Sequence, residues 1–153
     1  MTAADQASKA AAVYGLGHGR TLVLIPRLLQ LLYRTNTGAA FSLFRDFPMV
    51  LAIFSTIVSV GLIVWGWRLR PADVGLRWPI GLILGGAVGN LIDRYRIGHV
   101  VDFIDAHWNN VYHFPTFNLA DSAICVGMGW LISMSLRGGG DGVSKSGASP
   151  SSA

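Results

Sequence analysis

The sequence has little charge and almost no cysteine. Only 13% of its 153 residues are Asp, Glu, Lys or Arg, and 52% are hydrophobic, whereas about 25% of a soluble domain is charged. This shortage of charge argues against a soluble protein and indicates a protein embedded in a membrane. The single cysteine, Cys125, excludes an internal disulfide and a thiolate metal cluster. The first ten residues, MTAADQASKA, lack the apolar core of a signal peptide.

Basic residues exceed acidic ones, so nucleic acid has to be considered as a partner. The formal net charge is +4. The arginines are scattered along the chain, however, and several of them flank apolar runs, where membrane topology accounts for them. We therefore expect no nucleic-acid partner.

Three apolar segments predict membrane-spanning helices. Residues 47–67 carry no charge and are about as long as a bilayer requires, which is roughly 20 residues. Residues 78–95 begin apolar and end in charged residues that must face protein or the interface. Residues 118–136 form the third span, with Asp121 near its start. We expect an all-α helical bundle over residues 1–137 and a disordered Gly/Ser-rich tail over residues 138–153.

The region 10–44 differs from these segments because charge and proline interrupt its apolar residues. Arg20, Pro26, Arg27 and Arg34 break the pattern. It predicts short strands and turns, or an interfacial segment, at the membrane surface.

Glycines recur at every fourth position in the second span, at Gly81, Gly85 and Gly89. Small residues at this spacing let another helix approach closely within a membrane. The alternative is ordinary glycine use in a membrane helix. We expect close helix packing along this row.

The short link between the first two spans sets the expected orientation. Residues 68–77, RLRPADVGLR, hold three arginines and one acid. Positive charge in a short loop favours the cytoplasmic side. Arginines elsewhere weaken this signal, but the rule is strongest for short loops beside spans. Asp102, Asp105 and the start of the last span are then extracytoplasmic.

Carboxylates near the membrane are the candidate functional residues. Asn118 and Asp121 share one helix face, and a loop is expected to bring Asp102 to the same end. An ionised carboxylate in a membrane has a function or a partner. Two neighbouring carboxyls cannot both ionise easily, so one can take a proton from water while the other hydrogen-bonds a carbonyl. The sequence therefore predicts acid–base chemistry by Asp102 and Asp121.

The second span adds polar residues at the same end. Asn90 shares a helix face with Asp93 and with Arg94. For Asp93 and Arg94, the simpler interpretation is an ion pair that only locks the helices together. For Asp102 and Asp121, no matching base is evident.

A metal site is the weaker interpretation of the polar residues. Five candidate ligands occur between residues 99 and 113, namely His99, Asp102, Asp105, His107 and His113. No HExxH or comparable spacing supports a zinc site. We expect neither a metal nor any other cofactor.

Several motifs together resemble those of the lipoprotein signal peptidases (signal peptidase II), aspartic proteases of the bacterial cytoplasmic membrane. The matching stretches, in the family's order, are DQASK (5–9), RTNTGAAFSLF (34–44), GGAVGNLIDR (85–94), GHVVDFID (98–105) and FPTFNLADSAI (114–124). They cover most of the chain before the tail.

The resemblance implies a function and a set of site residues. Asp102 and Asp121 would be the catalytic dyad, supported by Asn36, Gly38, Asn90, Asp93, Arg94, Asn118, Asp5 and Lys9. The substrate would be a prolipoprotein whose cysteine carries diacylglycerol, cut just before that cysteine by a monomeric, multi-pass inner-membrane enzyme in contact with lipid. The active site would lie near the extracytoplasmic face, and residues 10–44 would form the family's small extracytoplasmic β-rich platform.

One departure from the family leaves other functions open. The family has four membrane helices, and the first ends near the DQxSK motif. That motif begins at Asp5 here, so we expect three spans and a first helix that is largely missing. The alternatives are a proton-coupled transporter or channel, in which the carboxylates relay protons, and an inactive truncated relic.

Overall fold

The structure is a computed structural model that describes residues 1–38, 48–109 and 111–138. Its elements in chain order are α1 (Thr2–Leu16), β1 (Thr21–Ile25), β2 (Leu29–Asn36), α2 (Pro48–Arg68), the short 3-10 helix η2 (Pro71–Asp73), α3 (Val74–Ile97), β3 (Val100–Trp108), β4 (Tyr112–His113) and α4 (Leu119–Gly138). The predicted tail after Gly138 and the motif residues 39–44 lie outside the described residues.

In the described part of the chain, three helices are long and apolar enough to cross a membrane, as the sequence predicts. These segments are Met49–Arg68, Pro71–Ile97 and Leu119–Arg137. Apolar side chains on α2 point outward: Phe54 is 62% exposed and Ile57 is 65% exposed. A helix that is apolar on every side suits a lipid environment. The middle helix begins at Val74 rather than at residue 78, because Gly75–Arg77 continue the helix into the link.

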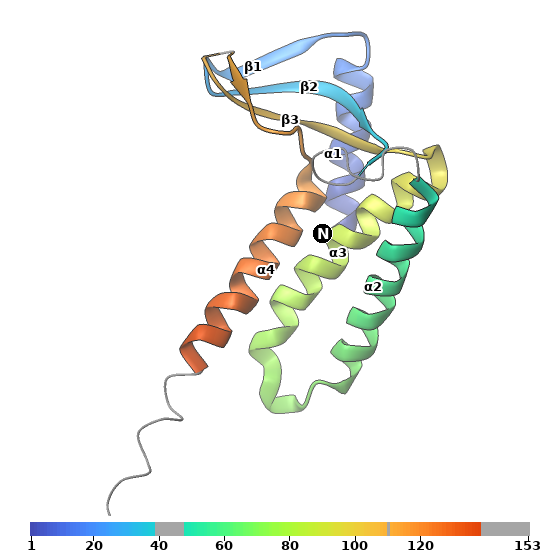
Figure 1. The fold of residues 1–153 in the computed structure, drawn as a ribbon, viewed down its shortest axis with the longest axis vertical. Helices are drawn as coiled ribbons and strands as arrows, with labels where there is room; N and C mark the ends of the chain where they lie inside the picture. Colours follow the sequence, from blue (N-terminus) through green and yellow to red (C-terminus); the bar gives the residue numbers. More distant parts are fainter. Residues whose placement is uncertain (39–47, 110, 139–153) are drawn as a thin grey trace, which may run out of the picture.

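The N-terminal helix extends farther along the chain than the sequence predicts. Helix α1 continues to Leu16, so residues 10–16 are neither strand nor interfacial loop. Six alanines lie between Thr2 and Leu16, and alanine has the highest helix propensity of all residues. Helix α1 packs against α3, α4 and the sheet. Figure 1 shows its N-terminal end near the upper ends of α3 and α4 and the rest of the helix passing behind the sheet.

A small antiparallel sheet lies across one end of the helices, with the strand order β1-β2-β3-β4. The predicted strands of region 10–44 are β1 and β2. The prediction that a loop carries Asp102 and Asp105 is wrong, because both lie on β3, where Asp102 faces Arg34 of β2. Acids at buried positions hide the apolar pattern of this strand. The fold therefore combines a helical bundle with a β-rich platform.

Glycines let α3 approach its neighbours closely at two of the three predicted positions and at one further position. A Cβ on Gly85 would lie 2.6 Å from Met1, and one on Gly89 would lie 2.5 Å from Asp5 Oδ2. A Cβ on Gly86 would collide with the backbone carbonyl of Ala120 on α4. Gly81 has no neighbour within 4 Å, so the prediction is wrong there. Contact uses Gly85, Gly86 and Gly89.

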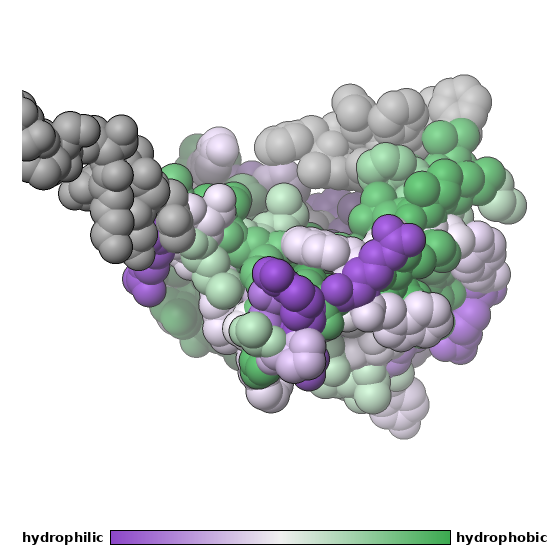
Figure 2. Space-filling model, turned by 90° about the horizontal axis from the view of Figure 1, so that it is seen from below, coloured by the Kyte–Doolittle hydropathy of each residue, from purple (hydrophilic) through white to green (hydrophobic). Residues whose placement is uncertain are grey.

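Charged side chains mark the end of the bundle that is remote from the sheet. Figure 2 looks onto that end and shows strongly hydrophilic residues beside hydrophobic ones. The link between α2 and α3 lies there, with Arg68, Arg70 and Arg77 exposed. The two ends of the bundle are thus chemically different: a basic link at one and the sheet at the other.

Candidate active site

The start of α4 places Asp121 through a reciprocal pair of hydrogen bonds. The backbone N–H of Asp121 donates to Asn118 Oδ1 at 2.9 Å, and the backbone N–H of Asn118 donates to Asp121 Oδ2 at 3.2 Å. This is a capping box, in which the cap residue and the third helical residue satisfy each other's free N–H groups. The Asp121 side chain is therefore fixed at the helix start, where it accepts a hydrogen bond from a backbone N–H group that would otherwise have no partner.

Asp102 is held on β3 by two asparagine side chains. Asn118 Nδ2 donates to Asp102 Oδ1 at 2.8 Å, and Asn36 Nδ2 donates to Asp102 Oδ2 at 2.9 Å. The Asn36 side chain is itself fixed, because its Oδ1 accepts the backbone N–H of Gly38 at 3.0 Å. Asp102 is only 1% exposed. Each of its two carboxylate oxygens thus accepts one hydrogen bond from the protein.

Asn118 connects the two carboxyl groups. Its side chain binds Asp102, and its backbone N–H binds Asp121. Asn90 on α3 completes the connection: its Nδ2 donates to Asp121 Oδ1 at 2.7 Å, and its Oδ1 accepts Asn118 Nδ2 at 3.2 Å. Residues from β3, α3 and α4 therefore meet in one hydrogen-bonded cluster, as the sequence predicts for these four side chains.

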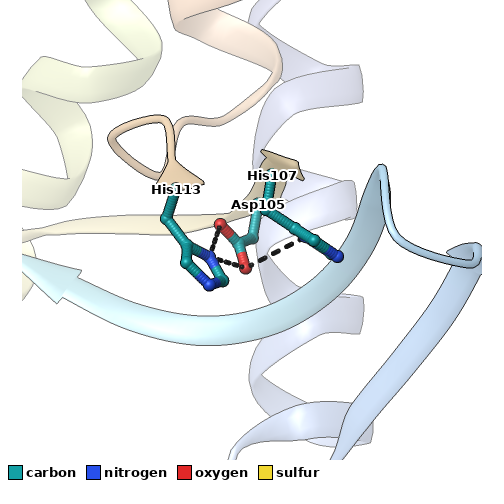
Figure 3. Close-up of side chains that lie close together, drawn as sticks. All are labelled: Asp105, His107 and His113. Carbon is teal, nitrogen blue, oxygen red and sulfur yellow. Dashed lines mark hydrogen bonds and ion pairs between the residues drawn. The ribbon is translucent and has the colours of Figure 1, made fainter. Parts of the chain in front are cut away.

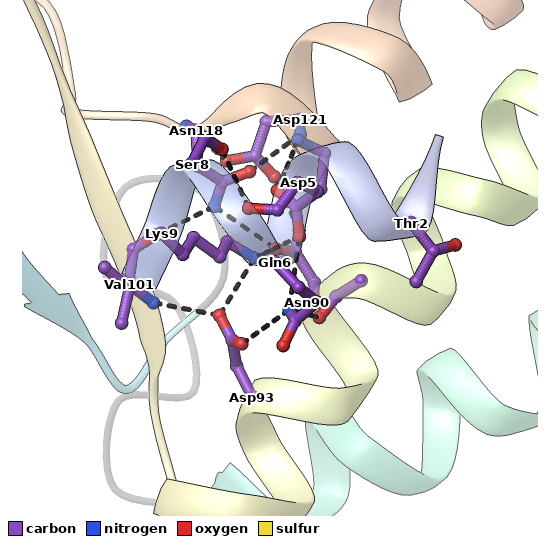
Figure 4. Close-up of polar contacts among 12 residues, drawn as sticks. Thr2, Asp5, Gln6, Ser8, Lys9, Asn90, Asp93, Val101, Asn118 and Asp121 are labelled. Carbon is purple, nitrogen blue, oxygen red and sulfur yellow. Dashed lines mark hydrogen bonds and ion pairs between the residues drawn. The ribbon is translucent and has the colours of Figure 1, made fainter. Parts of the chain in front are cut away.

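Lys9 supplies the positive charge beside this cluster. Its Nζ lies 2.9 Å from Asp5 Oδ2 and 2.8 Å from Asp93 Oδ2, and it donates to Asn90 Oδ1 at 2.8 Å. Figure 4 shows these groups around the Lys9 side chain, which comes from α1. Lys9 is 3% exposed and Asp5 is fully buried. The three N–H donors of the ammonium group are matched by three acceptors.

The predicted ion pair between Asp93 and Arg94 is wrong. Among the described residues, Asp93 pairs with Lys9, and Arg94 donates instead to the backbone carbonyls of Asn90 at 3.5 Å and Gly38 at 3.4 Å. Consecutive residues of a helix point about 100° apart, so Asp93 faces α1 while Arg94 faces Gly38. The buried Arg94 Nε has no hydrogen-bond partner among the described residues.

Sequence reasoning missed Gln6 and two backbone donors. Gln6 Nε2 donates to Asp93 Oδ1 at 2.9 Å and to the carbonyl of Gly89 at 3.1 Å. The N–H of Ala120, at the start of α4, donates to Asp5 Oδ1 at 2.9 Å, and the N–H of Val101 donates to Asp93 at 3.2 Å. Gln6 was visible only as a member of DQASK. Nothing in the sequence connects Asp5 with a helix that begins more than a hundred residues later.

Burial is the largest cause that raises the pKa of Asp102, and the hydrogen bond from Asn36 partly opposes it. The negative charge of Asp121 also raises this pKa, while the Asn118 hydrogen bond and the charge of Lys9 lower it, and the resulting pKa is about 6. Asp102 can therefore exchange a proton near neutral pH. Interacting carboxyls titrate as a pair, so the proton belongs to the pair rather than to one residue.

A second polar cluster lies farther along β3. Asp105, His107 and His113 each offer one metal-ligand atom, and these atoms lie within 4.8 Å of one another. Figure 3 shows both histidine rings beside the Asp105 carboxylate. His99 and Asp102, the other two candidate ligands from the sequence, lie outside this group.

Comparison with known proteins identifies the family. Residues 1–137 match the family model described as signal peptidase (SPase) II. The chain is 44% identical to the lipoprotein signal peptidase of Syntrophotalea carbinolica, over 91% of this chain and 88% of that one. It is 46% identical to the lipoprotein signal peptidase of Pseudomonas aeruginosa, over 80% of this chain and 75% of that one.

Solved structures agree with this match. One described as a bacterial membrane enzyme superposes with a TM-score of 0.84 at 28% identity, over 96% of this chain and 89% of that one. A second with the same description has a TM-score of 0.77 at 30% identity, over 89% of this chain and 87% of that one. The chain therefore belongs to the signal peptidase II family.

Proposed function

We propose that this protein is a membrane aspartic endopeptidase that removes signal peptides from diacylglyceryl-modified prolipoproteins. Asp102 and Asp121 activate the water that cuts the peptide bond. The observation that carries this proposal is the shared residue Asn118, which hydrogen-bonds one oxygen of each carboxyl group. Family membership supports the same reaction.

The hydrogen bonds leave the carboxyls free to react. Each of the four carboxylate oxygens accepts one bond from the protein, from Asn36, Asn90, or the side chain or backbone of Asn118. A carboxylate oxygen has two lone pairs, so each keeps one for water or substrate. The donors therefore orient the pair without occupying it.

The reaction needs one proton shared by the pair. The ionised carboxyl takes a proton from water as the water oxygen attacks the scissile carbonyl carbon, and the protonated carboxyl hydrogen-bonds the carbonyl oxygen. The tetrahedral intermediate then collapses, the C–N bond breaks, and the departing nitrogen takes up a proton from the pair. General acid–base catalysis of this kind contributes roughly 10²–10⁴-fold. Asn90 and Asn118 act as positioning residues.

The position of the site in the bundle supports a lipid-bearing substrate. Asp121 is the third residue of α4, at the sheet end of a helix long enough to span a membrane. The exposed arginines of the α2–α3 link lie at the other end, which favours a cytoplasmic link and an extracytoplasmic site in the bacterial inner membrane. Acyl chains held in the outer leaflet would bring a neighbouring peptide bond to this depth.

Cleavage by dyad variants tests the function. Asp102→Asn and Asp121→Asn should each abolish nearly all cleavage of a diacylglyceryl prolipoprotein peptide, and the double variant should be no worse, because members of a catalytic unit are not additive. Asp73→Asn, at the opposite end of the bundle, is the matched control and should cleave normally. A peptide with an unmodified cysteine should be cut far more slowly by the parent protein.

Other outcomes would overturn the proposal. Substantial cleavage by either single variant would exclude the dyad, and equal rates for the two peptides would exclude the lipid-dependent substrate. Proton flux across vesicles without proteolysis would favour the transporter alternative. Lack of cleavage by a folded, inserted parent protein would favour the inactive relic.

A further inference from the structure

The β3–β4 hairpin gathers three potential metal ligands outside the dyad. Asp105 and His107 are two residues apart on β3, so they lie on the same face of the strand. His113 on β4 pairs directly with His107 across the sheet. Strand pairing therefore brings together residues that show no metal-binding spacing in the sequence.

The distances suit a tetrahedral ion. His113 Nδ1 lies 3.0 Å from both oxygens of Asp105, and His107 Nδ1 lies 3.7 Å from Asp105 Oδ2. Ligand atoms in a tetrahedral zinc site are about 3.3 Å apart, given Zn–N bonds of roughly 2.0–2.1 Å. The two separations that involve Asp105 lie on either side of that value, and all three ligand atoms lie within 4.8 Å of one another. The two histidine rings stack with centroids 5.1 Å apart.

His107 has a donor or acceptor atom that the protein leaves unused. Its side chain is 1% exposed, and Nδ1 is buried without a hydrogen-bond partner among the described residues. This atom faces the Asp105 carboxylate at a distance too long for a hydrogen bond. A buried polar atom without a partner is unfavourable, and a metal ion bound beside Asp105 would satisfy it.

The Asp105 carboxylate is oriented by a side chain from β2. Gln30 Nε2 donates to Asp105 Oδ2 at 2.6 Å, as the outer partners of metal-bound carboxylates do. The His113 side chain is 45% exposed, which gives an ion access from solvent.

We propose that Asp105, His107 and His113 form a binding site for a divalent transition-metal ion, with Zn²⁺ as the best-suited ion. Imidazole and carboxylate ligands suit zinc, and three protein ligands leave a fourth position for water. The ion would join β3 to β4 and so fix the hairpin. The proposal departs from the sequence-based expectation of no metal, because the hairpin register creates the site.

Direct binding of Zn²⁺ to the purified full chain tests the proposal. The protein should carry no histidine affinity tag, should be freed of metal with a chelator, and should then be titrated in detergent by calorimetry. We expect one ion per chain and a rise in Tm with Zn²⁺. His113→Gln, at the exposed ligand, should weaken binding by more than tenfold, and Gln30→Ala should weaken it by roughly 10–100-fold.

Two control variants locate the ion. His18→Gln changes an exposed histidine outside the hairpin, in the connection between α1 and β1, and should bind Zn²⁺ like the parent. Asp102→Asn should also bind normally, which separates this site from the dyad. Absence of stoichiometric binding, or unchanged binding by His113→Gln, would overturn the proposal and leave a hydrogen-bonded Asp105–His113 pair. Loss of binding in Asp102→Asn or His18→Gln would place the ion elsewhere and overturn it equally.

Discussion

Lys9 is the residue on which the buried charges at the helix junction depend. Two carboxylates and one amide oxygen surround its ammonium group. The two carboxylates also accept backbone N–H groups of α4 and β3, through Ala120 and Val101. One side chain of α1 thus balances the charges that tie α3, α4 and the sheet together.

Removing the charge of Lys9 should destabilise the protein. Lys9→Met keeps much of the aliphatic stem but leaves Asp5 and Asp93 buried without a counter-ion, and breaking a buried pair typically costs about 3–5 kcal/mol. We expect a lower Tm in detergent and less accumulated protein. Arg94→Met is the matched control: Arg94 pairs with no carboxylate among the described residues, so it should accumulate normally. The reverse order of the two variants would contradict this assignment.

Asn36 should set the pH dependence of cleavage. Activity should fall as the pH rises through about 6, because Asp102 then loses its proton and the pair, with Asp121 already ionised, has no acid left to hydrogen-bond the scissile carbonyl. The Asn36 hydrogen bond lowers the pKa of Asp102, so Asn36→Ala should move this alkaline limb to higher pH.

The measurement is kcat/KM across pH for the parent and the variant. Thr35→Ala, at the exposed neighbouring position on β2, is the control and should leave the limb in place. A limb that stays at the parent pH in Asn36→Ala would show that this hydrogen bond does not tune the pair.

At the scale of elements, the sequence predicts α2 and α4 well and β3 poorly. Long runs of apolar residues identify a membrane helix without knowledge of its neighbours. Strand β3 carries Asp102 and Asp105 at buried positions, and hydrogen bonds from Asn36, Asn118 and Gln30 help to make this burial tolerable. These partners come from β2 and from the start of α4. The strand conformation of β3 therefore depends on tertiary contacts that its local sequence pattern does not reveal.

The same distinction applies to the site. The spacing of Asn118 and Asp121 within one helix turn could be read directly from the sequence. The pairing of Asp93 with Lys9 could not, because α1 and α3 meet only in the fold. The sequence predicted which side chains share a face of one helix. It did not predict which side chains from different helices or strands form ion pairs.

Two glycine substitutions on α3 should distinguish the effect of helix–helix contact on stability from the effect of helix propensity. Gly86→Ala would place a methyl group against the Ala120 carbonyl of α4, and overpacking of this kind costs about 1–3 kcal/mol. Gly81→Ala meets nothing within 4 Å and should be neutral or stabilising by up to about 1 kcal/mol, the propensity difference between the two residues. Thermal unfolding in detergent measures both. Equal Tm values for the two variants would contradict the close approach of α3 and α4.

At the scale of the whole molecule, the site lies where the bundle meets the sheet. Helices α1, α3 and α4 and strands β2 and β3 each contribute a side chain to it. The opposite end of the bundle holds the arginine-bearing link and, in the described residues, no part of this cluster. The two ends should therefore face opposite sides of the membrane.

Thiol labelling tests this orientation. In a Cys125→Ser background, a cysteine at Val111, which is 86% exposed on the β3–β4 connection, should react with an impermeant reagent added outside intact cells. A cysteine at the exposed Ala72 in η2 should react only after the membrane is opened. Labelling of Ala72→Cys alone in intact cells would invert the topology.

The contact between Asp5 and the start of α4 can form only after α4 has been synthesised. Asp5 and its partner Ala120 are 115 residues apart, and a ribosome adds roughly 5–20 residues per second. Helix α1 therefore waits about 6–23 s for α4 to be made, at that rate. Until then the start of α4 that joins Asp102 to Asp121 does not exist. If Asp102 and Asp121 form the proposed dyad, a partly synthesised chain is unable to hydrolyse peptides in the membrane, and activity begins only when the last helix is in place.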